Sequence, residues 1–371
     1  MRLTDIPTPA VLVESSRLER NLDRMQRAAD ARGLRLRPHA KTHKSPAVAA
    51  MQIQRGAVGI CCAKVGEAEV FADAGVTDIR LPYPLHPVSA DRVFALADRV
   101  TLSFIVDDLA IAQAWSDAAR QKGRTLDVLV KVDVGFHRCG IDPSSPDAAS
   151  LVRNIAALPG LRFQGLLSHA GHAYSATCDA EVKSIAATEA ELLRDLAHRS
   201  TVECAEISVG ATPTARFSLH ENGVTEIRPG NYAYFDRTQV GLGAADLADC
   251  ALTVLARVVS HPAPDRLIFD SGSKALTSDG ARGFAPSGGY GVVLQSLDGT
   301  LVAADLFIER LSEEHATVRA TSGKTPLRTG DLVRIIPNHS CVVSNLVDEV
   351  WLVDGEQAIE KLPVAARGRI T

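Results

Sequence analysis

The chain has 371 residues, of which 46% are hydrophobic, and its 44 acidic and 40 basic residues give a formal net charge of −4. This is the composition of a folded globular protein, and the length exceeds what one hydrophobic core usually spans, so two domains are expected. The balanced charge, without a lysine- or arginine-rich segment, argues against nucleic acid and anionic membranes as partners.

The beginning of the chain and its cysteines indicate a compartment. Residues 1–16 carry an aspartate and two prolines where a signal peptide would need an apolar run, and no apolar segment is long enough to cross a bilayer. The cysteines are odd in number and scattered, which argues against a disulfide framework and for reduced thiols. We therefore expect a cytoplasmic protein.

Between about residues 10 and 245, short apolar or β-branched runs alternate with longer segments whose apolar residues recur three and four apart. These features predict strands and helices in alternation, which is typical of a parallel (β/α)8 barrel. A doubly wound open sheet would show the same periodicity. The predicted strands are 34–37, 59–63, 78–81, 101–106, 126–134, 161–167 and 205–209, and the predicted helices are 16–32, 46–55, 65–74, 108–122 and 179–198.

After about residue 246 the pattern changes to closely spaced strand-like runs separated by Gly, Pro, Asp and Ser. This pattern predicts a mostly antiparallel β domain. The runs are 251–259, 266–270, 290–295, 332–336 and 349–353. The predicted division is therefore a first domain of residues 1–245 and a second of residues 246–371.

The first candidate for chemistry is the basic segment RPHAKTHK, which directly follows the predicted strand 34–37 and contains Lys41. In a parallel barrel the carboxyl ends of the strands form the mouth where active sites lie, so a lysine there would point into the site. A lysine amine can form a Schiff base with an aldehyde when its surroundings lower its pKa. From spacing alone, a solvated basic loop is the simpler interpretation.

Eight segments, in chain order, resemble the D-serine dehydratase and D-threonine aldolase branch of the alanine-racemase-like (fold-type III) pyridoxal-phosphate (PLP) enzymes. They are DIPTPAVLVESSRLERNLDRM, RPHAKTHKS, GICCAKVGEAEVFADAG, KVDVGFHRCG, GLLSHAGHAY, SVGATPTA, VTEIRPGNYAYFD and PNHSCVV. The resemblance implies a PLP-binding (β/α)8 barrel followed by a mostly antiparallel β domain that carries a metal-binding pair. It also implies that Lys41 holds PLP as a Schiff base.

Two turns resemble the part of the family that binds the cofactor phosphate. Small residues with free backbone N–H groups after a strand, together with hydroxyls, suit a phosphate monoester, although two ordinary turns would look the same. The resemblance assigns the phosphate to Gly210, Thr212, Gly230 and Asn231. It places Arg228 opposite the pyridine nitrogen, where an arginine would keep that nitrogen unprotonated and weaken the ring as an electron sink.

Other polar residues follow predicted strands in the middle of the chain. The resemblance implies that Arg138 reaches the cofactor O3′ or the substrate carboxylate, and that His169 packs on the cofactor ring. His172 and Tyr174 follow on the same loop as His169 and are candidates for moving protons. An isolated histidine or arginine would more simply be a structural residue, and the position at the barrel mouth favours function.

The third candidate is the pair His339 and Cys341, directly after the predicted strand 332–336. Residues two apart on an extended segment project to the same side, so an imidazole and a thiolate could share one ion. Sulfur and nitrogen donors favour zinc, and two ligands would leave positions open. The pattern alone is weak, but the resemblance implies a divalent metal ion here, zinc or manganese.

The resemblance implies a lyase acting on β-hydroxy D-amino acids of the D-serine or D-threonine type. In a dehydratase a base removes the Cα proton while the metal helps the hydroxyl to leave, which gives a 2-oxo acid and ammonia. In an aldolase a base deprotonates the metal-bound hydroxyl, and glycine and an aldehyde are released. The segments RPHAKTHKS and GICCAKVGEAEVF resemble the aldolases, whereas HAGHAY, SVGATPT and NHSC resemble the dehydratases.

Two positions favour dehydration, because the aldolases carry aspartate where this chain has Cys341 and histidine where it has Tyr174. An amino-acid racemase would leave the metal pair without a task, and a non-catalytic PLP-binding protein would lack the β domain. We therefore predict a dehydratase, with D-threonine aldolase as the alternative. The resemblance also implies a homodimer, and it assigns no role to the recurrent segment with Glu313, Glu314 and His315.

Overall fold

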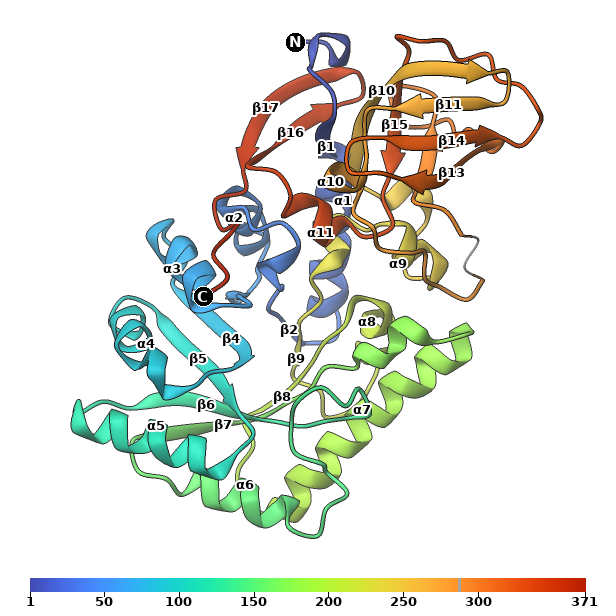
Figure 1. The fold of residues 1–371 in the computed structure, drawn as a ribbon. Helices are drawn as coiled ribbons and strands as arrows, with labels where there is room; N and C mark the ends of the chain where they lie inside the picture. The colour runs from blue at the N-terminus through green and yellow to red at the C-terminus, as the bar shows by residue number, and fades with distance from the viewer. Residues whose placement is uncertain (286–287) are drawn as a thin grey trace. The chain divides into compact units, whose positions relative to one another are not determined.

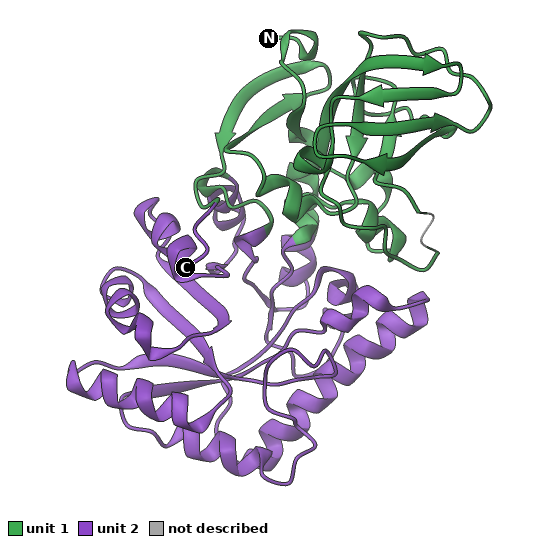
Figure 2. Ribbon diagram, viewed as in Figure 1, with its two compact units in different colours: residues 1–24, 42–47, 231–367 green, residues 25–41, 48–230, 368–371 purple. Residues whose placement is uncertain are grey.

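A computed structural model describes residues 1–285 and 288–371. The chain forms two compact units (Figure 2). Unit 1 comprises residues 1–24, 42–47 and 231–367, and unit 2 comprises residues 25–41, 48–230 and 368–371. The chain therefore passes from unit 2 to unit 1 directly after Lys41 and again after Gly230.

Unit 2 contains an eight-stranded sheet with the order β2-β9-β8-β7-β6-β5-β4-β3, in which all neighbouring strands are parallel. A parallel bridge between His39 and Cys61 joins the two ends of this order, and the Cys61 N–H donates to the carbonyl oxygen of Pro38 at 2.8 Å. The sheet is thus closed into a barrel, which confirms the predicted fold and excludes the open-sheet alternative. The strands are β2 (Arg35–Leu36), β3 (Ile60–Cys61), β4 (Asp78–Pro84), β5 (Thr101–Val106), β6 (Leu126–Lys131), β7 (Leu161–Leu167), β8 (Glu206–Val209) and β9 (Glu226–Ile227).

Helices follow the barrel strands along the chain and cover the outside of the sheet (Figure 1). The five predicted helices are present, with ends shifted by at most two residues, while α4, α6, α8 and the two-residue strand β9 were not predicted. The helices are α1 (Ser15–Asp30), α2 (Pro46–Gln54), α3 (Val65–Asp73), α4 (Ala90–Ala97), α5 (Leu109–Gln121), α6 (Ala148–Ala156), α7 (Asp179–Ser200) and α8 (Thr212–Ser218).

Unit 1 is built on a nine-stranded sheet whose main order is β13-β14-β11-β10-β1-β16-β17, with β15 pairing β10 and β12. All pairs are antiparallel except β1 with β16, which confirms the predicted mostly antiparallel domain. The strands are β1 (Ala10–Glu14), β10 (Leu252–Ala263), β11 (Arg266–Phe269), β12 (Val292–Leu294), β13 (Leu306–Leu311), β14 (Ala316–Ala320), β15 (Leu332–Ile336), β16 (Glu349–Asp354) and β17 (Gln357–Pro363). Three short helices complete it: α9 (Arg237–Gly241), α10 (Ser273–Leu276) and α11 (Ser340–Ser344).

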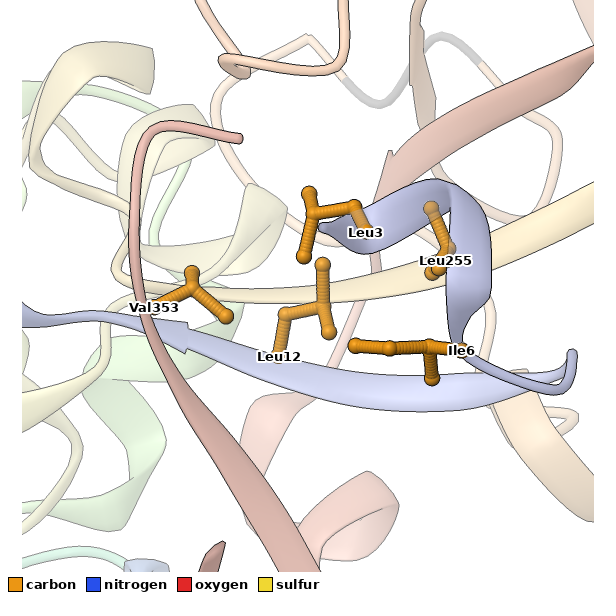
Figure 3. Packing of buried hydrophobic residues seen from close by; sticks show 5 residues of the cluster. All are labelled: Leu3, Ile6, Leu12, Leu255 and Val353. Atoms are coloured by element: carbon orange, nitrogen blue, oxygen red, sulfur yellow. The ribbon is translucent and has the colours of Figure 1, made fainter. Parts of the chain in front are cut away.

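The beginning of the chain belongs to this second sheet. Strand β1 pairs with β10 on one side and with β16 on the other, because its run Ala10–Glu14 is apolar on both faces and buried. Behind it, five fully buried side chains form one cluster, shown in Figure 3: Leu3, Ile6, Leu12, Leu255 and Val353. Burial of this apolar surface fixes the first strand between strands that come more than 200 residues later in the chain.

A network of charged side chains lies inside the barrel of unit 2. Glu226, on β9, is fully buried and accepts hydrogen bonds from Arg37 at 2.9 Å and from Arg80 at 2.5 Å. Burial raises the pKa of Glu226, but the charges of these two arginines outweigh burial and lower the pKa to about 2. Asp78 binds Arg37 and Glu206 binds Arg80, so each arginine keeps a second carboxylate.

We expect the Glu226→Gln variant to lose roughly 3 kcal/mol of unfolding free energy in urea titrations at pH 7. This is the low end of the range for breaking a buried ion pair, since both arginines retain one carboxylate. Because the folded-state pKa lies below the ordinary value of 4.5, the stability that Glu226 contributes is present above pH 4.5 and is lost as the pH falls towards 2. The stability difference between wild type and variant should therefore shrink over that interval.

The matched control is Asp127→Asn, which breaks the pair that Arg162 forms at 2.5 Å with Asp127. The side chain of Arg162 is 66% exposed, so this change should cost less than about 1 kcal/mol. Equal losses in the two variants would contradict the assignment of Glu226 to a buried charge network.

Candidate active site

The predicted cofactor residues of unit 2 lie in the loops that follow barrel strands. Lys41 lies in a 3-10 turn (Ala40–Thr42) after β2, Arg138 follows β6, His169 follows β7, Gly210 follows β8 and Arg228 follows β9. Because the carboxyl ends of parallel strands meet at one end of a barrel, these residues share the barrel mouth.

His169 marks the place where several of these residues meet. Its Nδ1 lies 2.5 Å from the carbonyl oxygen of Gly210, which accepts the hydrogen and leaves Nε2 as an acceptor. Burial lowers the pKa of His169 well below its usual value, and the positive charges of Lys41, Lys131 and Arg138 lower it further. The structure thus brings three basic side chains close to a neutral imidazole.

Phe136 fixes the relative positions of Arg138 and His169. Its ring lies edge-on to the His169 ring with centroids 5.8 Å apart, and the guanidinium of Arg138 lies 5.0 Å from its centroid. Gly171 allows this contact, because a Cβ there would lie 2.6 Å from an atom of the Phe136 ring. The loops after β6 and β7 are therefore packed against each other through this aromatic side chain.

Lys131, at the end of β6, was not recognised in the sequence as a site residue. Its side chain is buried, and burial together with the charge of Arg228 lowers its pKa to about 7. A lysine in an otherwise apolar strand gives no pattern by which its amine could have been placed near His169. It is the amine that competes most directly with Lys41 for the role of Schiff-base lysine.

Buried hydroxyls and carboxylates orient Arg228. Its Nε donates to Ser208 Oγ at 2.7 Å, and its Nη2 donates to the carbonyl oxygen of Ser168. Ser208 Oγ donates onward to Glu226 and Ser168 Oγ donates to Glu189, both at 2.6 Å. The sequence singled out Arg228, but neither serine nor carboxylate was predicted, because these contacts join strands that are distant in the sequence.

The turn predicted to bind phosphate has the features that a phosphate group requires. A Cβ at Gly210 would lie 3.1 Å from the Cβ of Arg228, so a side chain there would crowd the turn. Helix α8 begins at Thr212, whose buried Oγ1 has no hydrogen-bond partner among the residues that the structure describes. Unpaired N–H groups at a helix start and an unsatisfied hydroxyl fit a phosphate monoester, so these residues fit PLP.

His172 and Tyr174 lie in the 3-10 turn Gly171–Ser175 after β7. Burial lowers the pKa of His172, and its Nδ1 has no hydrogen-bond partner within residues 1–285 and 288–371. An ideal Cβ on Gly135 would lie 3.5 Å from the His172 ring, so the loop after β6 supports the imidazole. Tyr174 is half-buried, and its proton-transfer role stays a prediction.

In unit 1, His339 and Cys341 lie at the start of α11 and not on a strand. Strand β15 ends at Ile336, His339 is the N-cap residue with φ −145°, and Cys341 lies in the first helical turn. The expectation that both residues belong to one extended segment is therefore wrong. The turn nevertheless brings the imidazole and the thiol into hydrogen-bond contact.

The two side chains stabilise each other as an ion pair. Burial alone would lower the pKa of His339 and raise the pKa of Cys341. The hydrogen bond and opposite charges outweigh burial, so the pKa of His339 rises and that of Cys341 falls. The lowered pKa makes the thiolate, the form that a metal ion requires, more accessible than burial alone would allow.

Polar side chains surround Cys341 in unit 1. Its Sγ lies 3.1 Å from Thr42 Oγ1 and 3.4 Å from Asn231 Nδ2, and Asn231 Nδ2 also donates to Asp236 at 2.6 Å. Asn231 was predicted at the cofactor phosphate, whereas its side-chain amide lies against Cys341. A phosphate contact through its backbone N–H stays a prediction.

Two buried oxygens beside this pair, Asn231 Oδ1 and Tyr234 OH, lack hydrogen-bond partners in the described part of the chain. Burial, and then the charge of Cys341, raise the pKa of Tyr234. Unsatisfied oxygens next to nitrogen and sulfur donors fit a cation that carries its own water ligands. The residues present therefore fit a divalent metal ion.

Within the described residues, no group of three or more His, Cys, Asp or Glu side chains is arranged to hold a metal ion, so any ion at His339 and Cys341 would have few protein ligands.

No described helix combines the length and the apolar character needed to span a membrane. Glu313 and Glu314 form exposed ion pairs with Lys274 at 2.9 and 2.7 Å. These contacts indicate a surface role for that segment.

Comparisons with known proteins agree with this arrangement. Residues 13–238 match the family "Alanine racemase, N-terminal domain", and residues 251–353 match "Putative serine dehydratase domain". The chain is 34% identical to D-threo-3-hydroxyaspartate dehydratase of Delftia sp. (strain HT23), over 91% of this chain and 92% of that protein. It is 35% identical to D-threonine aldolase of Arthrobacter sp., over 99% of this chain and 94% of that protein.

Solved structures of D-threo-3-hydroxyaspartate dehydratase include variants in which a histidine, or a cysteine two positions later, is replaced by alanine. They match 98% of this chain, and 96% and 98% of their own, with 32% and 31% identity and TM-scores of 0.91 and 0.90. The cysteine variant is in the metal-free form.

The barrel and its C-terminal β domain define an alanine-racemase-like enzyme, a fold that implies PLP. The chain belongs to the family of D-serine dehydratases, D-threonine aldolases and 3-hydroxyaspartate dehydratases, which are lyases. The family and the enzyme class predicted from the sequence are confirmed.

Proposed function

We propose that the protein is a PLP- and divalent-metal-dependent dehydratase that converts a β-hydroxy D-amino acid into a 2-oxo acid and ammonia. The observation that carries the proposal is the contact between the Cys341 thiol and the His339 imidazole at the start of α11. The related dehydratase whose cysteine-to-alanine variant is in the metal-free form supports it. By resemblance, an aldolase would carry an aspartate at the position of Cys341.

The residues of the barrel mouth would hold the cofactor. Lys41 would bind the cofactor aldehyde, Thr212 and the N–H groups at the start of α8 would hold the phosphate, and Arg228 would face the pyridine nitrogen. The two hydroxyl–carboxylate pairs at Ser208 and Ser168 keep the Arg228 guanidinium in place. An arginine held in this way stays charged and cannot supply a proton to the ring nitrogen.

His339 and Cys341 would hold the metal ion, with Thr42 beside Cys341. Thr42 is the residue that follows Lys41, and its Oγ1 lies 3.1 Å from Cys341 Sγ. When bound, PLP would weaken the bonds at the substrate Cα, and the ion would act as a Lewis acid on the β-hydroxyl. Arg138 would bind the substrate carboxylate, because a guanidinium matches a carboxylate with two hydrogen bonds.

Residues of the barrel loops would transfer the protons. The Lys41 amine would act as the base for the substrate Cα proton. His169 is neutral and keeps Nε2 as an acceptor, and Tyr174 and His172 lie on the following turn. These groups would return a proton to the departing hydroxyl or to the product.

The alternative is a D-threonine aldolase, which the 35% identity to the Arthrobacter enzyme favours. The products distinguish the two reactions. With purified enzyme, PLP and zinc or manganese, we expect pyruvate and ammonia in equal amounts from D-serine, and 2-oxobutanoate and ammonia from D-threonine. A third test substrate is D-threo-3-hydroxyaspartate, the compound in the name of the related dehydratase. If the enzyme accepts this substrate, oxaloacetate should be released.

The assay measures 2-oxo acids, ammonia, glycine and acetaldehyde in the same reaction, with L-serine and D-alanine as controls. D-alanine has no β-hydroxyl, so it should give no 2-oxo acid. Glycine and acetaldehyde as the main products of D-threonine would replace the dehydratase by the aldolase. Conversion of D-alanine to L-alanine without any lyase product would contradict both.

A further inference from the structure

Asp279 lies against His339 and was not singled out in the sequence. Its Oδ2 is 2.6 Å from the Nδ1 of His339. Since a carboxylate accepts but cannot donate, this contact places a hydrogen on Nδ1. Nε2 is then the nitrogen that remains for a metal ion.

The contact by itself is weak, because the His339 and Asp279 side chains are 41% and 37% exposed, and exposed pairs contribute little to stability. The backbone around Asp279, however, is held in place. The buried Asn338 donates from Nδ2 to the carbonyl oxygens of Asp279 and Gly289, both at 2.9 Å. Arg237 donates to the carbonyl oxygen of Gly288 at 2.7 Å and to Asn338 Oδ1 at 3.3 Å.

Asn338 and His339 are consecutive, and both contact Asp279: one binds its backbone and the other its carboxylate. The second carboxylate nearby, Asp236, has a different task. It accepts from the Ser340 N–H at 2.9 Å and from the Gln239 N–H at 3.0 Å, so it shapes the turn. Asp279 is therefore the carboxylate whose hydrogen bond controls the His339 ring.

We infer that Asp279 is the positioning residue of the metal site, which fixes the tautomer and orientation of His339 and thereby sets the affinity for the ion. The inference rests on the proposed metal-binding role of His339 and Cys341, and it adds a carboxylate outside that pair. Carboxylate partners of metal-binding histidines typically change metal affinity by about 10- to 100-fold. The hydrogen bond from Nδ1–H to the carboxylate also makes Nε2 a stronger ligand for the ion.

The test measures zinc affinity and not turnover. The PLP-loaded protein is stripped with a chelator and titrated with zinc against a chromophoric competitor. We expect Asp279→Asn to raise the zinc Kd about 10-fold or more, while keeping the backbone carbonyl that Asn338 binds. The matched control, Asp298→Asn, changes an exposed carboxylate of the same unit that accepts from Ser296 and Thr300, and it should leave the Kd unchanged.

A double-mutant cycle separates positioning from general damage. In the His339→Ala background, Asp279→Asn should cause no further loss of zinc affinity, because its effect passes through the imidazole. At saturating zinc, ¹⁵N NMR of the histidine rings should show His339 with its hydrogen on Nδ1 and the metal on Nε2 in wild type, and a mixture of the two arrangements in Asp279→Asn. This signal does not respond to a role that is only structural, and it is readable if the variant is less stable.

Two failures are distinguishable. If wild type binds zinc through His339 and Cys341, but Asp279→Asn binds it equally well or shows the same tautomer, the inference is overturned and the proposed function stands. If wild type binds no divalent ion and turns over without one, the metal role in the proposed function fails, and the inference falls with it.

Discussion

A Lys41→Ala variant should lose the visible absorbance band of the cofactor after gel filtration, and its lyase activity should fall by about 10³-fold or more. The amine that would bind the PLP aldehyde lies in the turn after β2, near enough to His169 for its charge to lower the pKa of that imidazole. Without it, PLP can bind only through the phosphate and ring contacts, and the group that takes the Cα proton is missing. Absorbance spectra and product assays measure the two effects.

Borohydride reduction followed by peptide mapping should label Lys41, and three other lysines provide the comparison. The Lys44 amine is already bound to Asn345 Oδ1 at 2.7 Å, and the Lys64 amine lies 3.8 Å from the centroid of the Tyr83 ring. Lys131 is the strongest competitor, because its pKa of about 7 leaves a large neutral fraction. The matched control Lys64→Ala should keep the absorbance band, and a label on Lys131 in place of Lys41 would refute the assignment.

The parts of the fold that repeat over many residues could be predicted from the sequence. The barrel strands β5 and β7 have the predicted ends, because an apolar run between two amphipathic helices has few alternatives. In contrast, β4 ends three residues later and β6 three residues earlier than predicted. The strands β2, β3 and β9 have two residues each and depend on their neighbours in the closed barrel. The pairing of β2 with β9, and the bridge between His39 and Cys61 that closes the barrel, are tertiary properties that no local pattern reports.

The candidate site likewise contains residues that could be named from the sequence and residues that could not. Residues that belong to a motif, such as Lys41 and His339, could be named from the sequence by resemblance. The residues that support them could not, since Asp279 reaches His339 and Glu226 reaches Ser208 only through folding. The wrong expectation for Cys341 has a local cause. Strand β15 ends at Ile336 and α11 begins at Ser340, so the alternation of an extended strand no longer applies at Cys341.

Removal of the metal ion should abolish lyase activity and leave the visible cofactor band in place. The proposed cofactor contacts would come from Lys41, the turn at Gly210 and Arg228, and His339 and Cys341 are not among them. Chelator treatment of the wild type and the Cys341→Ala variant should therefore give the same result, and added zinc should restore only the wild type. Product assays and absorbance spectra of the same samples check both statements.

Cys341→Ala and Cys341→Asp distinguish a metal ligand from a packed thiol. If Cys341 only filled space, Cys341→Ala would cost about 1 kcal/mol of unfolding free energy and keep turnover, as we expect for the matched variant Cys250→Ala, which truncates a buried thiol in the same unit. As a ligand position, Cys341→Asp should keep an ion but exchange soft sulfur for hard oxygen, so its preference should shift from zinc towards manganese or magnesium. Competition titrations with the three ions measure the shift. Full activity in a chelated, metal-free preparation would remove the ion from the mechanism, and with it the reason to prefer β-hydroxy D-amino acids over simple racemisation.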